Sequence, residues 1–236
     1  MKPKIVILLN TSIYISRDFK KIKHFIFKYK KRSSIKKSNI QWGIQRIQQY
    51  SLGIERLKEL EIFNLYENVI FTDNTLGKKV LLPRKIKRTL PRNTQYILRR
   101  KNNLGKYNKG AGLVENLKFC LDSLNNYDYM IYFEPRLYAL NNKFFKSFLK
   151  SPGNVFYKNK NDFKSGYFGV SIIDFTNFIK SLDTDLMIQN GLSIETLLFD
   201  YFKNITSDFI EEPFTKRNTG YVKGLKINDK NSYEIY

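Results

Sequence analysis

The sequence predicts a single α/β domain over residues 1–236, with a mostly parallel central sheet flanked by helices. Short apolar runs of strand length alternate with longer segments whose apolar residues recur at helical spacing. This alternation favours parallel strands, because parallel neighbours need a crossover connection between them. The 42% hydrophobic content is that of a globular chain, and 236 residues can bury a substantial core.

The chain has one cysteine, Cys120, and one histidine, His24. A single cysteine excludes an internal disulfide and a metal site built from several cysteines. A single histidine excludes a zinc site with two histidine ligands. The apolar run Ile5–Leu9 is too short for a signal peptide or a membrane span. We therefore expect a cytoplasmic protein, free in solution or held peripherally at a membrane.

The positive charge lies almost wholly in the first half of the chain. The net charge is +21, and residues 1–107 hold 26 Lys and Arg against 6 Asp and Glu, whereas residues 108–236 hold 16 against 15. The first half is therefore expected to face a nucleotide diphosphate, a nucleic acid or an anionic membrane. A genome rich in A and T explains the abundance of lysine equally well, but it does not explain the asymmetry. We treat two segments as basic insertions, at about 17–41 and 78–106.

The first strand is expected at Lys4–Leu9. Asn10 and Thr11 follow it, where small polar residues often hold a nucleotide, although a simple turn has the same composition. Arg17–Arg32 has apolar residues on one helical face and lysines elsewhere, which predicts a basic amphipathic helix. Such a helix packs on a sheet as an ordinary surface helix, or lies on a membrane or a partner.

A second helix is predicted at Trp42–Leu60, and the next strand, Val69–Thr72, ends at Asp73. In a doubly wound sheet a carboxylate there is placed to bond a ribose or a base, with a plain turn as the alternative. Residues 78–106, broken by two prolines, are expected to form an irregular segment beside the ligand cleft, with a short strand at Tyr96–Leu98. Three polar positions of the second helix could contact ligand, although a solvated face is the simpler interpretation: Arg46, Tyr50 and Arg56.

The most informative stretch begins with a loop that contains Asn108, Lys109 and Gly110 and opens a helical pattern ending near residue 124. A buried strand is predicted next, at Tyr129–Phe133, and it stops at Glu134–Arg136. Opposite charges at the carboxyl end of a buried strand are costly unless they face a cleft, which is where ligands bind in open α/β sheets. The alternative is that the two charges merely pair with each other.

The second half of the chain is less regular. Asp174 and Ser193 are expected helix N-caps, and Asp183–Asn190 is expected to be a loop. The tail from Asp208 is expected to be partly ordered. Helices are predicted at Leu140–Leu149, Asp174–Leu182 and Ser193–Lys203, and strands at Val155–Tyr157 and Tyr167–Ile172.

With these pieces in order, the chain resembles the GT-A-fold glycosyltransferases, in particular small bacterial and viral polysaccharide-type members. The resemblance covers roughly residues 4–200. It implies a GT-A-like, Rossmann-like domain that transfers a sugar from a nucleotide-diphospho-sugar to a glycan, protein or lipid-linked acceptor. The segments that carry it are KIVILLNT, VIFTDN, NKGAGLVENLKFCLDSL, YDYMIYFEPR, FKSGYFGVS and LSIETLLF.

In that family the strand that corresponds to Tyr129–Phe133 ends in an Asp-x-Asp motif, whose carboxylates bind a divalent metal such as Mn²⁺ or Mg²⁺. The metal holds the donor diphosphate. Here Glu134 takes the first place as a metal ligand, but Arg136, which cannot ligate a metal, takes the second. As an alternative, Arg136, Lys109 and basic residues of 84–100 stabilise the departing diphosphate without metal.

The resemblance also assigns roles to individual residues. Glu195, in the first turn of a predicted helix, matches the general base of inverting members and would deprotonate the acceptor hydroxyl. A carboxylate there is also what any helix N-terminus favours. Donor contacts are implied for Asn10, Thr11, Asp73, Asn108, Lys109 and Gly110, acceptor-side contacts for Gly166, Tyr167 and Phe168, and catalytic roles for Glu134, Arg136 and Glu195.

Two other functions remain open at this point. A non-catalytic basic module would bind nucleic acid or an anionic membrane surface, as the uneven charge suggests. A catalytically inactive GT-A-like domain would explain the degenerate metal motif.

Overall fold

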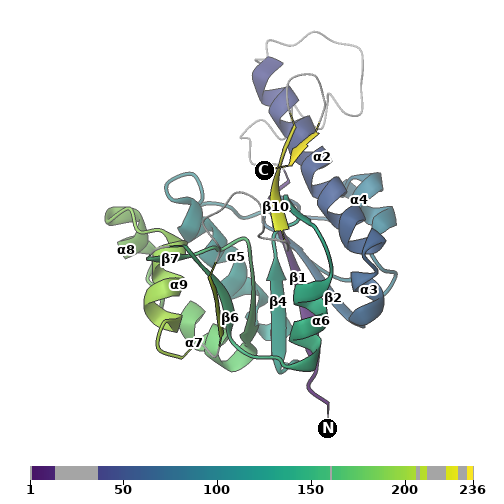
Figure 1. The fold of residues 1–236 in the computed structure, drawn as a ribbon. Coiled ribbons are helices and arrows are strands. Elements are labelled where there is room, and N and C mark those ends of the chain that lie inside the picture. Colours follow the sequence, from purple (N-terminus) through teal and green to yellow (C-terminus); the bar gives the residue numbers. More distant parts are fainter. Residues whose placement is uncertain are drawn as a thin grey trace.

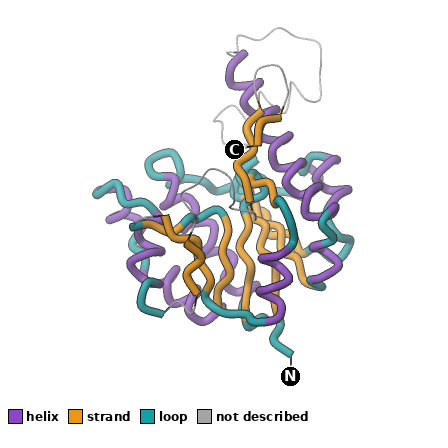
Figure 2. Tube along the Cα trace, viewed as in Figure 1, coloured by secondary structure: helices purple, strands orange, loops and turns teal. Residues whose placement is uncertain are grey.

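The computed structural model describes residues 2–13, 37–159, 161–205, 208–211, 222–227 and 233–235. The predicted helix Arg17–Arg32 and His24 lie outside this part of the chain. A central sheet flanked by helices confirms the α/β class (Figures 1 and 2).

The strands are β1 Ile5–Thr11, β2 Asn68–Asp73, β3 Gln95–Leu98, β4 Tyr129–Phe133, β5 Leu137–Ala139, β6 Val155–Asn159, β7 Asp162–Phe163, β8 Tyr167–Ser171, β9 Asp208–Glu211, β10 Val222–Ile227 and β11 Tyr233–Ile235. The helices are α2 Lys37–Glu59, α3 Ile62–Leu65, the 3₁₀ turn η1 Lys79–Leu81, α4 Arg84–Thr89, α5 Lys109–Leu124, α6 Lys143–Lys150, α7 Ile172–Ser181, α8 Thr184–Gln189 and α9 Ile194–Phe202.

The central sheet is mixed, rather than mostly parallel as predicted. Its order is β3-β2-β1-β4-β8-β6-β7, with β9 paired to β6. The first four strands of this order run parallel, whereas β8 is antiparallel to β4 and to β6. In the second half, β6, β7 and β8 follow one another through connections too short for a helical crossover, so antiparallel pairing results.

Both faces of the sheet are buried, and β1 shows why its sequence is a continuous apolar run. Ile5, Ile7 and Leu9 belong to one core cluster, and Val6 and Leu8 to the other. Residues of α2, α3, α4 and α6 pack in the first cluster, and residues of α5, α7, α8 and α9 in the second. Because helices cover both faces, ligands can reach the sheet only at its edges and strand ends.

Two local predictions are wrong in the second half. The expected loop Asp183–Asn190 contains α8, which Asp183 caps by accepting hydrogen bonds from the N–H groups of residues 185 and 186. The N-cap of α7 is Ser171, and Asp174 lies in its first turn. Both errors have one cause: several Ser and Asp residues compete for cap positions, and tertiary packing decides between them. The N-cap predicted at Ser193 is confirmed.

Residues 78–106 form η1, α4 and β3, so this segment is more regular than predicted. Strands β9, β10 and β11 belong to the tail that begins at Asp208. Its strand β10 lies between β5 and β11 in a separate antiparallel sheet. In the described residues, no helix is both long enough and apolar enough to cross a membrane.

The helix α2 packs closely on the turn that connects β4 to β5. A Cβ atom at Gly53 would lie 1.9 Å from the carbonyl oxygen of Pro135 and 2.8 Å from that of Leu137. Only glycine therefore allows this approach. Farther along α2, the Arg56 guanidinium donates to the carbonyl oxygens of Ala139 (2.9 Å) and Leu140 (3.0 Å). Gly53 and Arg56 together fix the turn and β5 against the helix.

Candidate functional site

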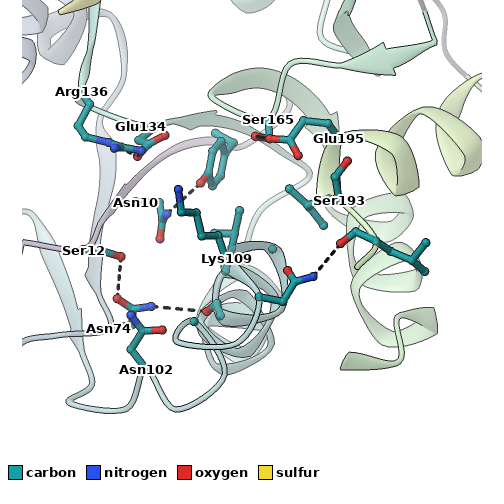
Figure 3. A pocket seen from close by; sticks show the side chains of 18 of the residues that line it. Asn10, Ser12, Asn74, Asn102, Lys109, Glu134, Arg136, Ser165, Ser193 and Glu195 are labelled. Carbon is teal, nitrogen blue, oxygen red and sulfur yellow. Dashed lines mark hydrogen bonds and ion pairs between the residues drawn. The ribbon is translucent and has the colours of Figure 1, made fainter. Parts of the chain in front are cut away.

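A cavity of about 640 Å³ opens at the carboxyl ends of β1 and β4. The chain passes from β1 to β2 on one side and returns to β4 on the other, so this is the point where the strand order reverses. Ligands bind at such reversal points in open α/β sheets. The other walls are the N-terminus of α5, the loop before it and residues 191–195 (Figure 3).

The cavity brings seven of the twelve predicted site residues together from four separate parts of the chain. They are Asn10, Asn108, Lys109, Gly110, Glu134, Arg136 and Glu195.

One end of the cavity is lined by hydroxyl and amide side chains, with the Arg46 guanidinium beside Ser12. The Ser12 hydroxyl donates to Asn74 Oδ1 (2.7 Å), and the Asn74 amide donates to the carbonyl oxygen of Gly112 (3.5 Å). Asn102 lies beside them, and its Oδ1 atom is buried without a hydrogen-bond partner among the described residues (Figure 3). The hydroxyl and amide groups at this end can hydrogen-bond a polar ligand.

Ser12 is held from both sides by α2. Its N–H donates to Tyr50 Oη (3.0 Å), and its carbonyl oxygen accepts from Arg46 Nε (2.5 Å). Arg46 Nη2 also donates to Tyr50 Oη (3.1 Å). Both side chains are buried, so the solvated face expected for them is wrong. Burial lowers the pKa of Arg46 and raises that of Tyr50 to about 12.

The middle of the cavity floor is a hydrogen-bonded network between strands and α5. The Asn10 amide donates to Tyr132 Oη (2.9 Å), and Asn10 Oδ1 accepts from the Asn116 amide (2.8 Å). Asn116 also donates to Thr72 Oγ1 (3.2 Å). Burial raises the pKa of Tyr132 well above its ordinary value, so Tyr132 stays a neutral hydroxyl. These hydrogen bonds fix the orientation of the Asn10 side chain at the cavity wall.

The N-terminus of α5 points into the cavity. Asn108 caps it, with Oδ1 accepting from the Ala111 N–H (3.0 Å), while the Asn108 amide donates to the carbonyl oxygens of Met187 and Leu192. Its side chain is thus used to join α5 to the loop between α8 and α9. The backbone N–H groups of Lys109 and Gly110 have no protein acceptor among the described residues. Such groups attract anions.

Lys109 is the exposed cation at this end of α5, and its side chain extends across the middle of the cavity (Figure 3). Within the described chain it has no ion-pair partner. The loop before α5 packs tightly against the helix, because a Cβ atom at Gly112 would lie 2.5 Å from the Cα of Gly105. These glycines bring the backbone of residues 102–112 to the cavity wall.

Glu134 and Arg136 lie together at the end of β4. Arg136 Nε and Nη2 both donate to Glu134 Oε1, and the two side chains are 22% and 40% exposed for Glu134 and Arg136 respectively. Burial alone would lower the pKa of Arg136, but the Glu134 carboxylate raises it, so the guanidinium keeps its charge. The ion pair weighed as an alternative is therefore present, and it faces the cavity.

Glu195 lies across the cavity from Glu134, in the first turn of α9 (Figure 3). The Ser165 hydroxyl donates to Glu195 Oε1 (2.5 Å), and Ser193 caps the helix by accepting from the Thr196 N–H (3.1 Å). The Ser165 contact fixes the direction of the Glu195 carboxylate. A carboxylate so oriented can accept a proton from a hydroxyl bound in the cavity.

Two predicted donor contacts do not fit this structure. The Asp73 carboxylate is fully buried and accepts hydrogen bonds from the N–H groups of Ile13, Thr75 and Leu76 and from the hydroxyls of Thr11 and Thr75. Its acceptor capacity is used to hold its own loop and the segment that follows β1. Thr11 is buried beside it, and neither residue lines the cavity.

The three predicted acceptor-side residues also lie away from the cavity. Tyr167 and Phe168 belong to β8 and are both buried, Tyr167 in one core cluster and Phe168 in the other. Phe168 stacks on Tyr132 with ring centroids 4.8 Å apart. Gly166 packs against Leu137, where a Cβ atom would lie 2.6 Å from Leu137 Cδ1. The neighbouring Ser165 is the residue that reaches the cavity.

The donor set does not fit a divalent metal. The described residues contain no group of three His, Cys, Asp or Glu side chains that could hold one. The Oε1 atom of Glu134 already binds the Arg136 guanidinium, whose positive charge opposes a metal ion at that place. We therefore derive no step through a metal.

Sequence reasoning missed several cavity residues. Ser12, Asn74 and Ser165 directly follow or precede predicted site positions, so their nearness to the strand ends was available as a signal. Tyr132 was assigned to the core because it lies within an apolar run. Asn102 is placed by tertiary packing of the loop after β3, and no local pattern marks it. Arg46, weighed in the sequence as a possible ligand contact, does line the cavity.

The chain matches no known protein-family model and no curated protein.

Proposed function

We propose that the protein is a glycosyltransferase that takes a sugar from a nucleotide-diphospho-sugar, as the GT-A resemblance implies. The observation that carries the proposal is the cavity itself. A reversal point of the sheet, a helix N-terminus with a lysine, and two carboxylates from different elements all meet there. This combination suits a ligand with a polar base, an anionic diphosphate and a sugar.

The chemical character of the walls suggests how the donor lies. The end at Ser12, Asn74 and Asn102 presents hydroxyl and amide groups, which suit a base and ribose. Lys109 and the free N–H groups of α5 suit the diphosphate. The sugar then lies between Glu134 and Glu195, where the carboxylates can bond its hydroxyls.

In the proposed reaction, Glu195 accepts the proton of the acceptor hydroxyl as that oxygen attacks the anomeric carbon. The bond between this carbon and the diphosphate oxygen breaks, and the nucleoside diphosphate leaves with the electron pair. Lys109 and the α5 N-terminus stabilise its negative charge, with Arg136 at the same rim. Among the cations of residues 84–100, none lines the cavity, so this segment has no part in the proposed step.

The test is thermal stability in the presence of a panel of nucleosides, nucleoside diphosphates and nucleotide sugars, with and without Mn²⁺. A ligand that binds the native state raises the melting temperature by mass action. We expect diphosphates and one nucleotide sugar to stabilise the protein without Mn²⁺. The proposal is overturned if no member of the panel does so.

The matched variants are Lys109→Met and Lys106→Met. Lys106 is an exposed lysine of the same loop that does not line the cavity. Removing one charge-assisted contact weakens binding by about 10- to 100-fold. We expect Lys109→Met to lose that much affinity for the diphosphates, but not for the nucleosides, and Lys106→Met to behave as the wild type. Equal affinities in both variants would exclude Lys109 from the diphosphate site.

A further inference from the structure

A long stretch of the chain carries only positive charge, and the cavity does not account for it. Residues 74–114 contain twelve Lys and Arg and no Asp or Glu. They form η1, α4, the edge strand β3 and the loop that leads to α5. Of these twelve cations, only Lys109 lines the cavity. The others that are exposed are Lys78, Lys79, Arg84, Lys85, Lys87, Arg88, Arg92, Arg100, Lys101 and Lys106.

The cations of η1 lie beside those that follow β3. Lys79 Nζ lies 3.8 Å from the centre of the Tyr96 ring, in β3. A Cβ atom at Gly77 would lie 3.4 Å from the Cβ of Arg100. Residues 78–80 and 99–101 therefore form one surface, which we call the cationic face. The loop from Arg100 continues through Asn102 to the cavity rim, so the cationic face borders the cavity.

Apolar side chains are exposed on and around this face. Val80 follows Lys78 and Lys79 and is 76% exposed. Phe119 is 48% exposed, and the Arg99 guanidinium lies 4.6 Å from its ring centre. Tyr107, in the loop to α5, is 67% exposed. At a membrane, lysines beside an exposed aliphatic side chain can contact anionic headgroups while that side chain reaches hydrocarbon.

We propose that the cationic face docks on a membrane rich in anionic phospholipid, with Val80 entering the boundary between headgroups and acyl chains. Charge attraction alone would serve a nucleic acid equally well. A valine side chain, however, makes no favourable interaction with phosphates and cannot stack on a base as an aromatic ring does. It does gain from contact with hydrocarbon. The docking stands independently of the proposed function; only its consequence, that the cavity meets a lipid-linked acceptor at the membrane, rests on it.

The experiment is co-sedimentation of the full chain with vesicles of phosphatidylcholine alone or mixed with phosphatidylserine. The variant K78Q/K79Q/K101Q removes three charges from the cationic face. Its control, K143Q/K146Q/K150Q, removes three exposed lysines from α6, which lies elsewhere on the molecule (Figure 1). Each basic residue near an anionic surface contributes about 5-fold to binding, so the first variant is expected to bind the mixed vesicles roughly 100-fold more weakly than the control.

A second pair of variants separates lipid from nucleic acid. Val80→Ser removes the exposed valine, and Leu149→Ser removes another aliphatic side chain, which lies on α6 and is 41% exposed. We expect Val80→Ser alone to weaken vesicle binding, by about 10-fold, and neither variant to change binding to single-stranded DNA. The proposal is overturned if the two triple variants bind vesicles equally, or if Val80→Ser binds them as the wild type does. Tighter binding of the wild type to DNA than to mixed vesicles would favour a nucleic-acid partner instead.

Discussion

Two carboxylates stand at the ends of β2 and β4, the two strands that pair with β1, and the structure uses them in opposite ways. Asp73, after β2, is fully buried and accepts hydrogen bonds from its own loop and from the end of β1. Glu134, after β4, faces the cavity with Arg136 as its partner. In the turn after β4 the backbone is satisfied without a carboxylate, because the Glu134 N–H donates to the carbonyl oxygen of Gly166 (2.8 Å) and the Leu137 N–H to that of Glu134 (2.9 Å). The helix α2 also packs on this turn at Gly53. A carboxylate at a strand end is therefore available to a ligand only where something else satisfies the loop's backbone.

The largest effect expected from this comparison is on the Asp73 loop. Asp73→Asn replaces one acceptor oxygen with an amide that faces N–H and O–H donors, so the free energy of unfolding should fall by about 3 kcal/mol. The measurement is urea unfolding. Asp122→Asn, an exposed position on α5, is the control and should change stability by less than about 0.5 kcal/mol. Equal stabilities of the two variants would mean that Asp73 does not hold its loop.

The next effect is on the support of the turn after β4. Gly53→Ala places a methyl group 1.9 Å from a carbonyl oxygen, so α2 or the turn must move. We expect a loss of about 2 kcal/mol in unfolding free energy and weaker ligand binding, although alanine in a helix normally stabilises by about 1 kcal/mol relative to glycine. Gly77→Ala, whose new methyl group would meet its nearest neighbour at 3.4 Å, should be close to neutral. A stabilised Gly53→Ala variant would refute the close approach.

Tyr50 tests how far α2 also supports the loop after β1. Burial raises the pKa of Tyr50 to about 12 in the folded protein, against about 10 when unfolded. Between these pH values the unfolded chain loses the proton first, so Tyr50's contribution to stability is complete below pH 10 and is lost as pH rises toward 12, at up to about 1.4 kcal/mol per pH unit. Tyr50→Phe should be less stable at neutral pH, because the Ser12 N–H loses its acceptor, but should lose stability less steeply at alkaline pH. Parallel stability curves for both proteins would contradict this.

The smallest effect on stability is expected at Glu134. Glu134→Gln breaks a partly exposed ion pair, which costs less than about 1 kcal/mol. Urea unfolding in the absence of ligand should therefore resemble that of the wild type, while stabilisation by nucleotide sugars is lost. A large loss of stability would mean that Glu134, like Asp73, holds the backbone around it.

The comparison also shows what the sequence could and could not predict. Apolar runs located β1, β2, β4 and β8 to within two residues, because burial on both faces leaves a continuous signal. The end of an apolar run located the charged residues after β4, and the start of a helical pattern located the one at the start of α5. Local pattern could not tell that Asp73 is consumed by its own loop, that Tyr167 lies inside the sheet, or that Arg46 is buried. Those outcomes depend on which segments pack together.

The pairing of β5 with β10 has a consequence for how the protein is made. β5 continues directly from the turn that carries Glu134 and Arg136, and Leu137, Tyr138 and Ala139 pair with residues 222–224. A ribosome adds about 5–20 residues per second, so roughly four to sixteen seconds separate the synthesis of the two strands. During that interval β5 lacks this neighbour, and the rim of the cavity lacks its backing. The nascent chain can thus pair β1, β2 and β4 well before β10 is made and supports the strand that follows the Glu134 turn.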